Sequence, residues 1–453
     1  MIKTVALISA LVGGTLLVAV APAETPAKSD SDGNTLVVFI TGNMLGELKP
    51  CGCSGGQLGG LDRRSAILGS IPDSRRLIID TGSFVPDSGE QNLIKFNTVV
   101  QALGLLDYDV VNLAEDDLEI AQRQGLLDSI GSVFSVISSA GEDLNIPAKS
   151  TKQFAIAGGA ISVTVAAYDG AGAQKDLSEL LGRENERSGI NVNILIVNRR
   201  DAGTLDTISQ IGLSDCIIVP PDSDEPAVVG EPNAMPLVIS AGRLGKYVGK
   251  LQITVPEGNN SPRLAFSSAA ITENLAQNQE LVELYKVYQQ LVKDANLLER
   301  QPRFALPSGL EYVGSKTCRL CHDYEYDKWK PQKHASAYAT LEKVGSQYDP
   351  ECVVCHVIGM EYKGGFVSER GTAELKDVGC ENCHGPGSEH IWTLGATETA
   401  GPMSVCTDCH TPEHSAEYAG NTDTYFRKTI HWREPVWRRN VEPQKTVKSE
   451  EKQ

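Results

Sequence analysis

Cys318-Arg319-Leu320-Cys321-His322 is the first of four five-residue stretches that determine how the C-terminal third of this chain is organised. The other three begin at Cys352, Cys380 and Cys406 and keep the same C-x-x-C-H spacing. This pattern is the attachment signature of c-type haem. Two thiols three positions apart reach the two vinyl groups of one haem, and the adjacent histidine falls beneath the iron as its proximal ligand.

The four motifs predict four covalently bound haem c groups. Zinc-binding C-x-x-C pairs are the alternative, but four such pairs close together, each followed by histidine, are hard to explain in that way. The predicted attachment residues are Cys318, Cys321, Cys352, Cys355, Cys380, Cys383, Cys406 and Cys409. The predicted proximal ligands are His322, His356, His384 and His410.

The motifs are closely spaced, with starts 34, 28 and 26 residues apart. So little protein for each haem predicts a mostly α domain with little regular structure, in which the porphyrins form the core. We expect Trp329, Tyr338 and Trp392 to pack against them. Haems held so close together suit electron hopping.

Histidines outside the motifs are candidates for the second axial position. The chain has eight histidines, and the four that are not in motifs are His334, His390, His414 and His431. Each iron can therefore have a histidine on both faces, which leaves no open position. Met360 and Met403 are alternative ligands, better explained as packing residues. If one histidine points away, one haem becomes five-coordinate and can bind a small ligand.

The N-terminal part alternates apolar runs with amphipathic stretches, which predicts an α/β domain with a mixed sheet. The expected strands are residues 35–41, 76–80, 110–113, 133–137, 192–197 and 216–219, and the expected helices are 61–71, 92–106, 116–130 and 202–213. Two further stretches, 154–167 and 247–271, suggest antiparallel strands on the second sheet of a sandwich.

Further segments can be recognised at the two ends of the chain and between its two domains. Residues 1–23 combine Lys3, an apolar run and Ala21-Pro22-Ala23, as in a Sec-type signal peptide. Export to the periplasm or another extracytoplasmic space follows, with an uncleaved membrane anchor as the alternative. The predicted segments are a signal peptide at 1–23, a linker at 24–34, the α/β domain at 35–272, a connecting helix at 273–302, the tetrahaem domain at 303–440 and a disordered tail at 441–453.

The charge of the chain limits the classes of partner that it can bind. A formal net charge of −17 argues against nucleic acid and anionic lipid and allows redox protein partners, while oligomerisation stays open.

Three cysteines lie outside the motifs. Cys51 and Cys53 form a C-x-C pair, either a redox disulfide or soft-metal site or else a structural disulfide or inert thiols. Cys216 lies in an apolar run, which predicts a buried thiol.

The stretch from Gly314 to about His414 resembles the tetrahaem cytochrome family typified by cytochrome c-554, the electron carrier of ammonia oxidisers. The segments that carry the resemblance are GSKTCRLCH, KHASAYATL, ECVVCHVIGM and GCENCHGPGSEH. In that family the histidine after the tryptophan and the histidine of HGPGSxH are distal ligands. The resemblance assigns these roles to His334 and His390. Some members have one haem with an open site.

Residues 35–270 resemble the calcineurin-like fold of the 5′-nucleotidase group, through VVFITGNMLGELKPCGC, GGLDRR, LIIDTGSF and DVVNLAEDDLE. Active members hold two metal ions with Asp, His and Asn side chains. This part of the chain contains no histidine, and a dinuclear phosphatase site needs imidazole. The resemblance therefore implies a sandwich that is catalytically inactive, with Asp80, Asn112 and Asp116 as relics or loop-capping residues.

The leading hypothesis is an exported tetrahaem electron-transfer protein whose N-terminal domain positions it against a partner or another subunit. A redox enzyme for small nitrogen compounds, such as hydroxylamine or nitrogen oxides, is the alternative and needs a five-coordinate haem. A bifunctional phosphoesterase-cytochrome is opposed by the missing histidines. A haem wire built from stacked subunits is the fourth hypothesis.

Overall fold

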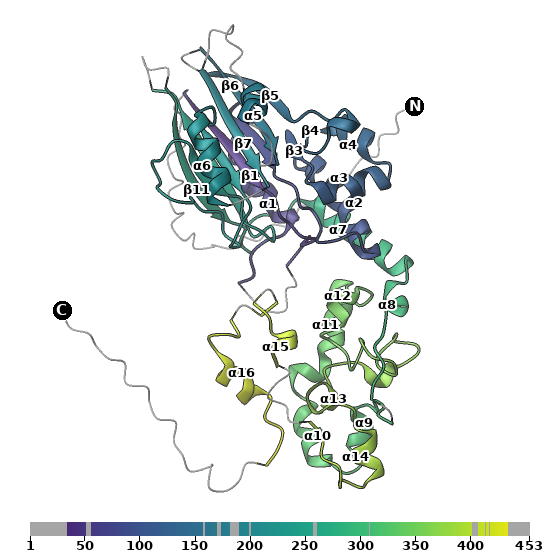
Figure 1. The fold of residues 1–453 in the computed structure, drawn as a ribbon. Helices are drawn as coiled ribbons and strands as arrows, with labels where there is room; N and C mark the ends of the chain where they lie inside the picture. The colour runs from purple at the N-terminus through teal and green to yellow at the C-terminus, as the bar shows by residue number, and fades with distance from the viewer. Residues whose placement is uncertain are drawn as a thin grey trace, which may run out of the picture.

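The computed structural model places an α/β domain at one end of the molecule and the domain with the C-x-x-C-H motifs at the other (Figure 1). The signal peptide, most of the linker, Cys51, Cys53, Met403 and the tail lie outside the residues that the structure describes. Those residues are 34–50, 56–156, 159–169, 174–181, 190–198, 201–256, 261–307, 309–400, 406–412, 414–415 and 417–433.

The first sheet has six strands in the order β11-β10-β1-β2-β3-β4. Its parallel part runs from β1 to β4, and β10 pairs with β1 in the antiparallel sense. The strands are β1 (Thr35–Thr41), β2 (Arg76–Asp80), β3 (Val110–Asn112), β4 (Ser135–Ile137), β10 (Tyr247–Thr254) and β11 (Arg263–Ala270).

The second sheet has five strands in the order β5-β6-β7-β8-β9. The strands β6 to β9 are parallel, and β5 is antiparallel to β6. They are β5 (Lys149–Ile156), β6 (Gly159–Tyr168), β7 (Ile190–Val197), β8 (Cys216–Val219) and β9 (Leu237–Ser240).

Side-chain alternation along the strands produces four layers. Leu36, Val38 and Ile40 of β1 lie in the core between the two sheets, whereas Phe39 faces the helices on the other side. These helices are α1 (Leu61–Leu68), α2 (Glu90–Leu105), α3 (Glu115–Arg123), α4 (Leu127–Val133) and α7 (Gln279–Asp294). The outer face of the second sheet packs against α5 (Gln174–Leu181) and α6 (Ala202–Ile211). The predicted α/β sandwich is therefore confirmed.

Several predicted elements are placed differently. The segment 247–271 forms a hairpin on the first sheet, because β10 pairs with β1. Gly125, with φ 65°, separates α3 from α4 where one helix was predicted. The predicted connecting helix is α7 and the short α8 (Leu297–Arg300), separated at Asn296 with φ 51°, and α7 packs in the α/β core. Neither β9 nor α5 was predicted.

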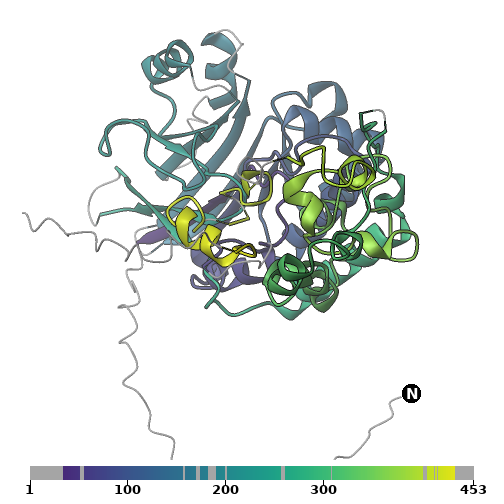
Figure 2. The ribbon, with the colours of Figure 1, turned by 90° about the horizontal axis from the view of Figure 1, so that it is seen from below.

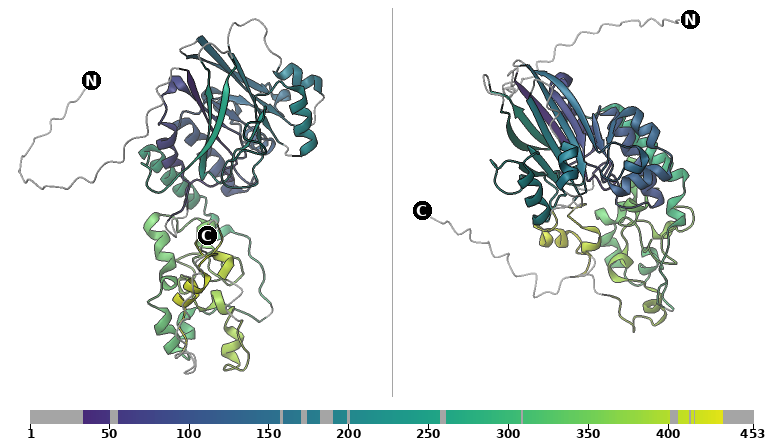
Figure 3. Two further views of the ribbon diagram at one scale, coloured as in Figure 1. Left: turned by 90° about the vertical axis from the view of Figure 1, so that its left-hand side faces the viewer. Right: turned by 45° about the horizontal axis from the view of Figure 1, so that its top comes forward.

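The C-terminal domain consists of short helices joined by long loops, as predicted (Figure 3). Its side-chain core is small and centres on Tyr338, Phe366 and Ile358. Its helices are α9 (Ser315–Cys318), α10 (Asp323–Trp329), η3 (Lys333–Ser336), α11 (Ala337–Val344), α12 (Pro350–Val353), η4 (Ala373–Leu375), α13 (Cys380–His384), α14 (Ser388–Trp392), α15 (Cys406–Cys409) and α16 (Thr422–Lys428).

The two domains meet where α2 and α7 face α12, and the view from below shows the C-terminal domain in front of the sheets (Figure 2). Asp349 caps α12 and accepts hydrogen bonds from Gln91 (2.8 Å) and from the Tyr288 hydroxyl (2.9 Å). Lys95 forms an ion pair with Glu351. These contacts tie the second C-x-x-C-H motif directly to the α/β domain.

None of the helices in the described part of the chain has the length and apolar character that a bilayer crossing requires.

Candidate functional site

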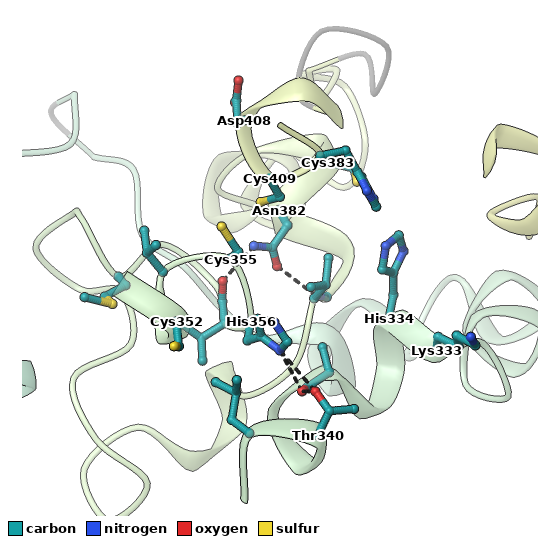
Figure 4. Close-up of a pocket in the computed structure, with 18 of the residues that line it drawn as sticks. Lys333, His334, Thr340, Cys352, Cys355, His356, Asn382, Cys383, Asp408 and Cys409 are labelled. Atoms are coloured by element: carbon teal, nitrogen blue, oxygen red, sulfur yellow. Dashed lines mark hydrogen bonds between the residues drawn. The ribbon is translucent and has the colours of Figure 1, made fainter. Parts of the chain in front are cut away.

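One large cavity runs through the C-terminal domain and reaches the α/β domain. Its volume is about 2360 Å³, well above the roughly 300–1,000 Å³ of a pocket for a single small ligand. The predicted attachment cysteines of all four motifs line it, and so do all eight histidines (Figure 4). The structure therefore brings every site residue predicted from the sequence to one continuous wall.

Three pairs of imidazole rings face each other across this cavity. The ring centroids of His322 and His390 are 5.9 Å apart. Those of His334 and His410 are 6.3 Å apart, and those of His384 and His431 are 6.1 Å apart. Each pair joins one motif histidine to one of the other four histidines.

The separation within each pair matches what a haem iron needs. Two iron–nitrogen bonds of about 2 Å, with about 1.1 Å from each ring nitrogen to its centroid, place two axial imidazoles roughly 6 Å apart. A direct stack of two rings is shorter, as the 4.9 Å between His410 and Tyr418 shows. The three histidine pairs are therefore spaced to admit an iron between them.

The other ring nitrogen of these histidines is held by the protein. Since a carbonyl oxygen only accepts hydrogen bonds, an Nδ1 that contacts one must carry its proton, which leaves Nε2 free to bind a metal. The Nδ1 to carbonyl distances are 2.7 Å for His356 to Ala337, 3.3 Å for His384 to Ala400, 2.7 Å for His390 to Thr397 and 2.8 Å for His431 to Thr429. Burial also lowers the pKa of His334 and of His384, which favours the neutral ligand form.

The remaining two histidines are held by hydrogen bonds of their own. The Nδ1 of His414 lies 2.9 Å from the Thr411 hydroxyl. The Nδ1 of His356 donates to the Ala337 carbonyl. Axial ligation by His414 stays a prediction.

Cysteines of different motifs approach one another, which orders the motifs in space. The thiols of Cys318 and Cys380 lie close enough to interact, and so do those of Cys355 and Cys409, which Figure 4 labels. Cys383 lies within electrostatic range of Cys406. The motifs therefore follow one another in the order first, third, fourth and second.

One buried carboxylate within the third motif connects three segments of the site. Glu381 is only 4% exposed and accepts hydrogen bonds from the backbone N–H groups of Val313, Gly314 and Gly387 at 2.7 to 3.1 Å. It fixes the first motif and the segment of His390 to the third motif. This role could not be predicted from the sequence, because an acidic residue between two cysteines is usually solvated.

The aromatic residues expected around the haems have different places. Trp329 lines the cavity and donates from its indole nitrogen to the Val378 carbonyl at 3.1 Å. Tyr338 instead packs against Phe366 in the small side-chain core. Trp392 is absent from the residues that line the cavity, and its side chain is 80% exposed. The prediction that it packs against haem therefore finds no support. Met360 is buried in the side-chain core and also lines the cavity.

The α/β domain has a buried hydrogen-bond network at the ends of β1 and β2. Asp80 is fully buried and accepts from the Thr41 hydroxyl (2.6 Å) and from the Gly82 N–H (2.9 Å). Thr41 also contacts the Tyr108 hydroxyl (2.8 Å), to which the Arg64 guanidinium donates (3.0 Å). Burial raises the pKa of Asp80. Within the described residues, no group of three or more His, Cys, Asp and Glu side chains is placed to hold a metal ion.

The residue that caps the loop beside this network is Asp117, the neighbour of the predicted Asp116. Asp116 is exposed, whereas the buried Asp117 accepts from the N–H groups of Ser83, Phe84 and Ala114 at 2.6 to 3.2 Å. Burial raises the pKa of Asp117 to about 7. Asn112 is buried and donates to the Thr81 carbonyl at 2.9 Å. Cys216 is buried in the core between the sheets, and burial raises its pKa.

Comparisons with known proteins agree with the motifs. Residues 317–385 match the family described as cytochrome c554 and c-prime, a stretch that contains the first three motifs. Cytochrome c-554 of Nitrosomonas europaea is 36% identical over 98 residues, which are 18% of this chain and 42% of that protein. The chain thus spans less than half the length of this relative. The predicted resemblance of the C-terminal part is confirmed, and it implies covalently bound haem c.

Solved structures similar to the α/β domain share little sequence with it. A calcineurin-like phosphoesterase, YfkN from Bacillus subtilis, covers 57% of this chain and 97% of its own at 11% identity, with a TM-score of 0.45. A 5′-nucleotidase precursor from Thermus thermophilus covers 66% and 67% at 16% identity, with a TM-score of 0.44. The architecture described above rests on the sheet topology itself.

Proposed function

We propose that this chain is an exported tetrahaem c-type cytochrome that carries electrons between redox proteins outside the cytoplasm. The observation that carries the proposal is the set of three facing histidine pairs, each spaced for one iron, on a cavity lined by four attachment motifs. Four haem c groups held there supply one-electron oxidation and reduction at successive irons.

The protein's own residues set the properties of such a carrier. The cysteine contacts place the motifs in the order first, third, fourth and second, which gives a direction to the row of sites. Two imidazoles on one iron keep small molecules off it and favour a low reduction potential. Carbonyls that accept from Nδ1 make these imidazoles stronger ligands.

The α/β domain is proposed to be non-hydrolytic. Its polar groups at the ends of β1 and β2 are satisfied by Thr41, Tyr108 and Arg64. An arginine that is 1% exposed supplies the positive charge that metal ions supply in an active phosphoesterase. Its contacts with α12 suggest that it shields one end of the haem site from water.

A redox titration followed by visible spectroscopy tests the main proposal. We expect four haems per chain that reduce in overlapping one-electron steps at low potential, with no change on addition of cyanide to at least three of them. A protein that binds haem but exchanges no electrons with small-molecule mediators contradicts the carrier function.

A further inference from the structure

The segment Gly59-Gly60-Leu61-Asp62-Arg63-Arg64 places two adjacent arginines in different environments. Arg64 is buried and belongs to the network of Asp80 and Tyr108. Arg63, one position earlier on α1, lies on the wall of the haem cavity. The α/β domain therefore presents a guanidinium to the C-terminal domain.

Within the described residues, the side chain of Arg63 makes no hydrogen bond or ion pair, and its Nε is buried without a partner. A buried donor without an acceptor destabilises the folded protein, and more so when it is charged. The planar guanidinium suits two oxygens of a carboxylate or similar oxyanion. Both facts point to an anion as the missing partner.

The surroundings of Arg63 fit such an anion. Lys49 lines the same wall and lies 3.8 Å from the carboxylate of Asp62, the residue before Arg63. Gln57 donates to the backbone carbonyl of His414 at 3.1 Å, which brings this wall against the segment that follows the fourth motif. Glu47 and Glu273 also line the wall, but neither forms an ion pair with Arg63.

We propose that Arg63, with Lys49 on the same wall, is an anion-binding site that the α/β domain contributes to the haem cavity. Its ligand is a carboxylate or small oxyanion. Two sources share this chemistry: a propionate of a haem held in the cavity, or an anion taken from solution. The inference rests on the proposed haem loading.

The test compares the wild-type protein with Arg63→Gln, which removes the charge, and Arg63→Lys, which keeps it. Arg123→Gln is the matched control, because Arg123 is exposed on α3 and pairs only with Glu119 four residues earlier. Haem content is measured first by the pyridine haemochrome method. Midpoint potentials are then measured by spectroelectrochemistry at rising inorganic phosphate and constant ionic strength.

A cation beside a haem stabilises the reduced haem, which carries one positive charge fewer than the oxidised haem. Removal of the charge in Arg63→Gln therefore lowers the midpoint potential of that haem. Arg63→Lys and Arg123→Gln keep the wild-type value. If the partner is a propionate, the shift is the same at every phosphate concentration. If the partner comes from solution, the wild-type potential changes with phosphate and that of Arg63→Gln does not.

Equal potentials in all four proteins at every phosphate concentration, with four haems in each, overturn this inference alone. A wild-type haem count below four overturns the proposed function and the inference with it. Loss of one haem in Arg63→Gln, with Arg63→Lys and the control fully loaded, supports a propionate as the partner.

Discussion

At the scale of single residues, the site depends on the second nitrogen of each imidazole. His390 and His431 donate from Nδ1 to carbonyls only seven and two residues away in the chain. Such local bonds fix the ring before any iron binds, so that little freedom is lost on ligation. The distal ligands are therefore set by their own loops.

This account predicts that His390→Ala converts one low-spin haem to high-spin without loss of haem, because the thioether bonds remain. His414→Ala tests the remaining predicted ligand, and it converts a further low-spin haem if His414 binds iron. EPR spectra of the oxidised proteins measure both. An unchanged low-spin signal in His390→Ala contradicts the pairing of His390 with His322.

A second prediction concerns Asp117, whose pKa burial raises from 3.8 to about 7. Between these values the folded state binds more protons than the unfolded chain, so this group's stabilisation is present at low pH and is lost as pH rises through 7. Melting temperatures of wild type and Asp117→Asn are compared from about pH 5 to pH 8. As pH rises, the melting temperature of the wild type falls relative to that of Asp117→Asn. A constant difference contradicts the raised pKa.

Single residues also show what sequence can and cannot predict. The motif cysteines and histidines follow from covalent chemistry, and all of them line the cavity. Glu381, Asp117 and Arg64 could not be recognised, since their importance comes from burial among partners distant in the chain. Trp392 was misjudged because hydrophobicity does not show which face of a short helix meets the cavity.

At the scale of elements, α12 connects the two domains. It has only four residues, Pro350–Val353, and its cap Asp349 is shared with α2 and α7. A short helix is not stable alone, so its geometry depends on the α/β domain. The second motif begins inside this helix, at Cys352.

We predict that Asp349→Ala destabilises the junction between the domains by about 2–4 kcal/mol, since it removes a helix cap and leaves the buried Tyr288 hydroxyl without an acceptor. Thermal unfolding and protease cleavage at the junction measure the effect. Arg300→Gln, which removes an exposed pair with Glu90 and a hydrogen bond to the Ala295 carbonyl, is the control and has a much smaller effect. Equal effects of the two changes rule out this role of Asp349.

Periodicity located most elements of the α/β domain, because apolar runs and helical spacing reflect burial directly. It could not place the hairpin of β10 and β11, since alternation is the same on either sheet. It also missed the breaks at Gly125 and Asn296, where a backbone with positive φ ends a helix within a continuous pattern.

At the scale of the whole molecule, the edge of the first sheet where β1 and β2 end lies close to the haem cavity. Thr41 and Asp80 at this edge are bonded to each other, while Glu47 and Leu48, a few residues beyond β1, line the haem cavity. The α/β domain thus serves as a wall of the redox site.

We therefore predict no hydrolysis of nucleotides or phosphate esters above the uncatalysed rate when Mn²⁺, Mg²⁺ or Zn²⁺ is added to the purified protein. Arg64→His with Tyr108→Phe, which opens the network around Asp80, is a useful companion variant and should remain inactive, because the other metal ligands are also missing. Metal-dependent turnover by the wild-type protein contradicts the non-hydrolytic assignment.

The most direct test of the central claim is EPR of the purified, oxidised protein with haem counted by pyridine haemochrome. The account predicts four haems per chain, of which three give low-spin signals that cyanide does not change, as three facing histidine pairs require. Fewer than four haems, or high-spin signals from two or more of them, would contradict it.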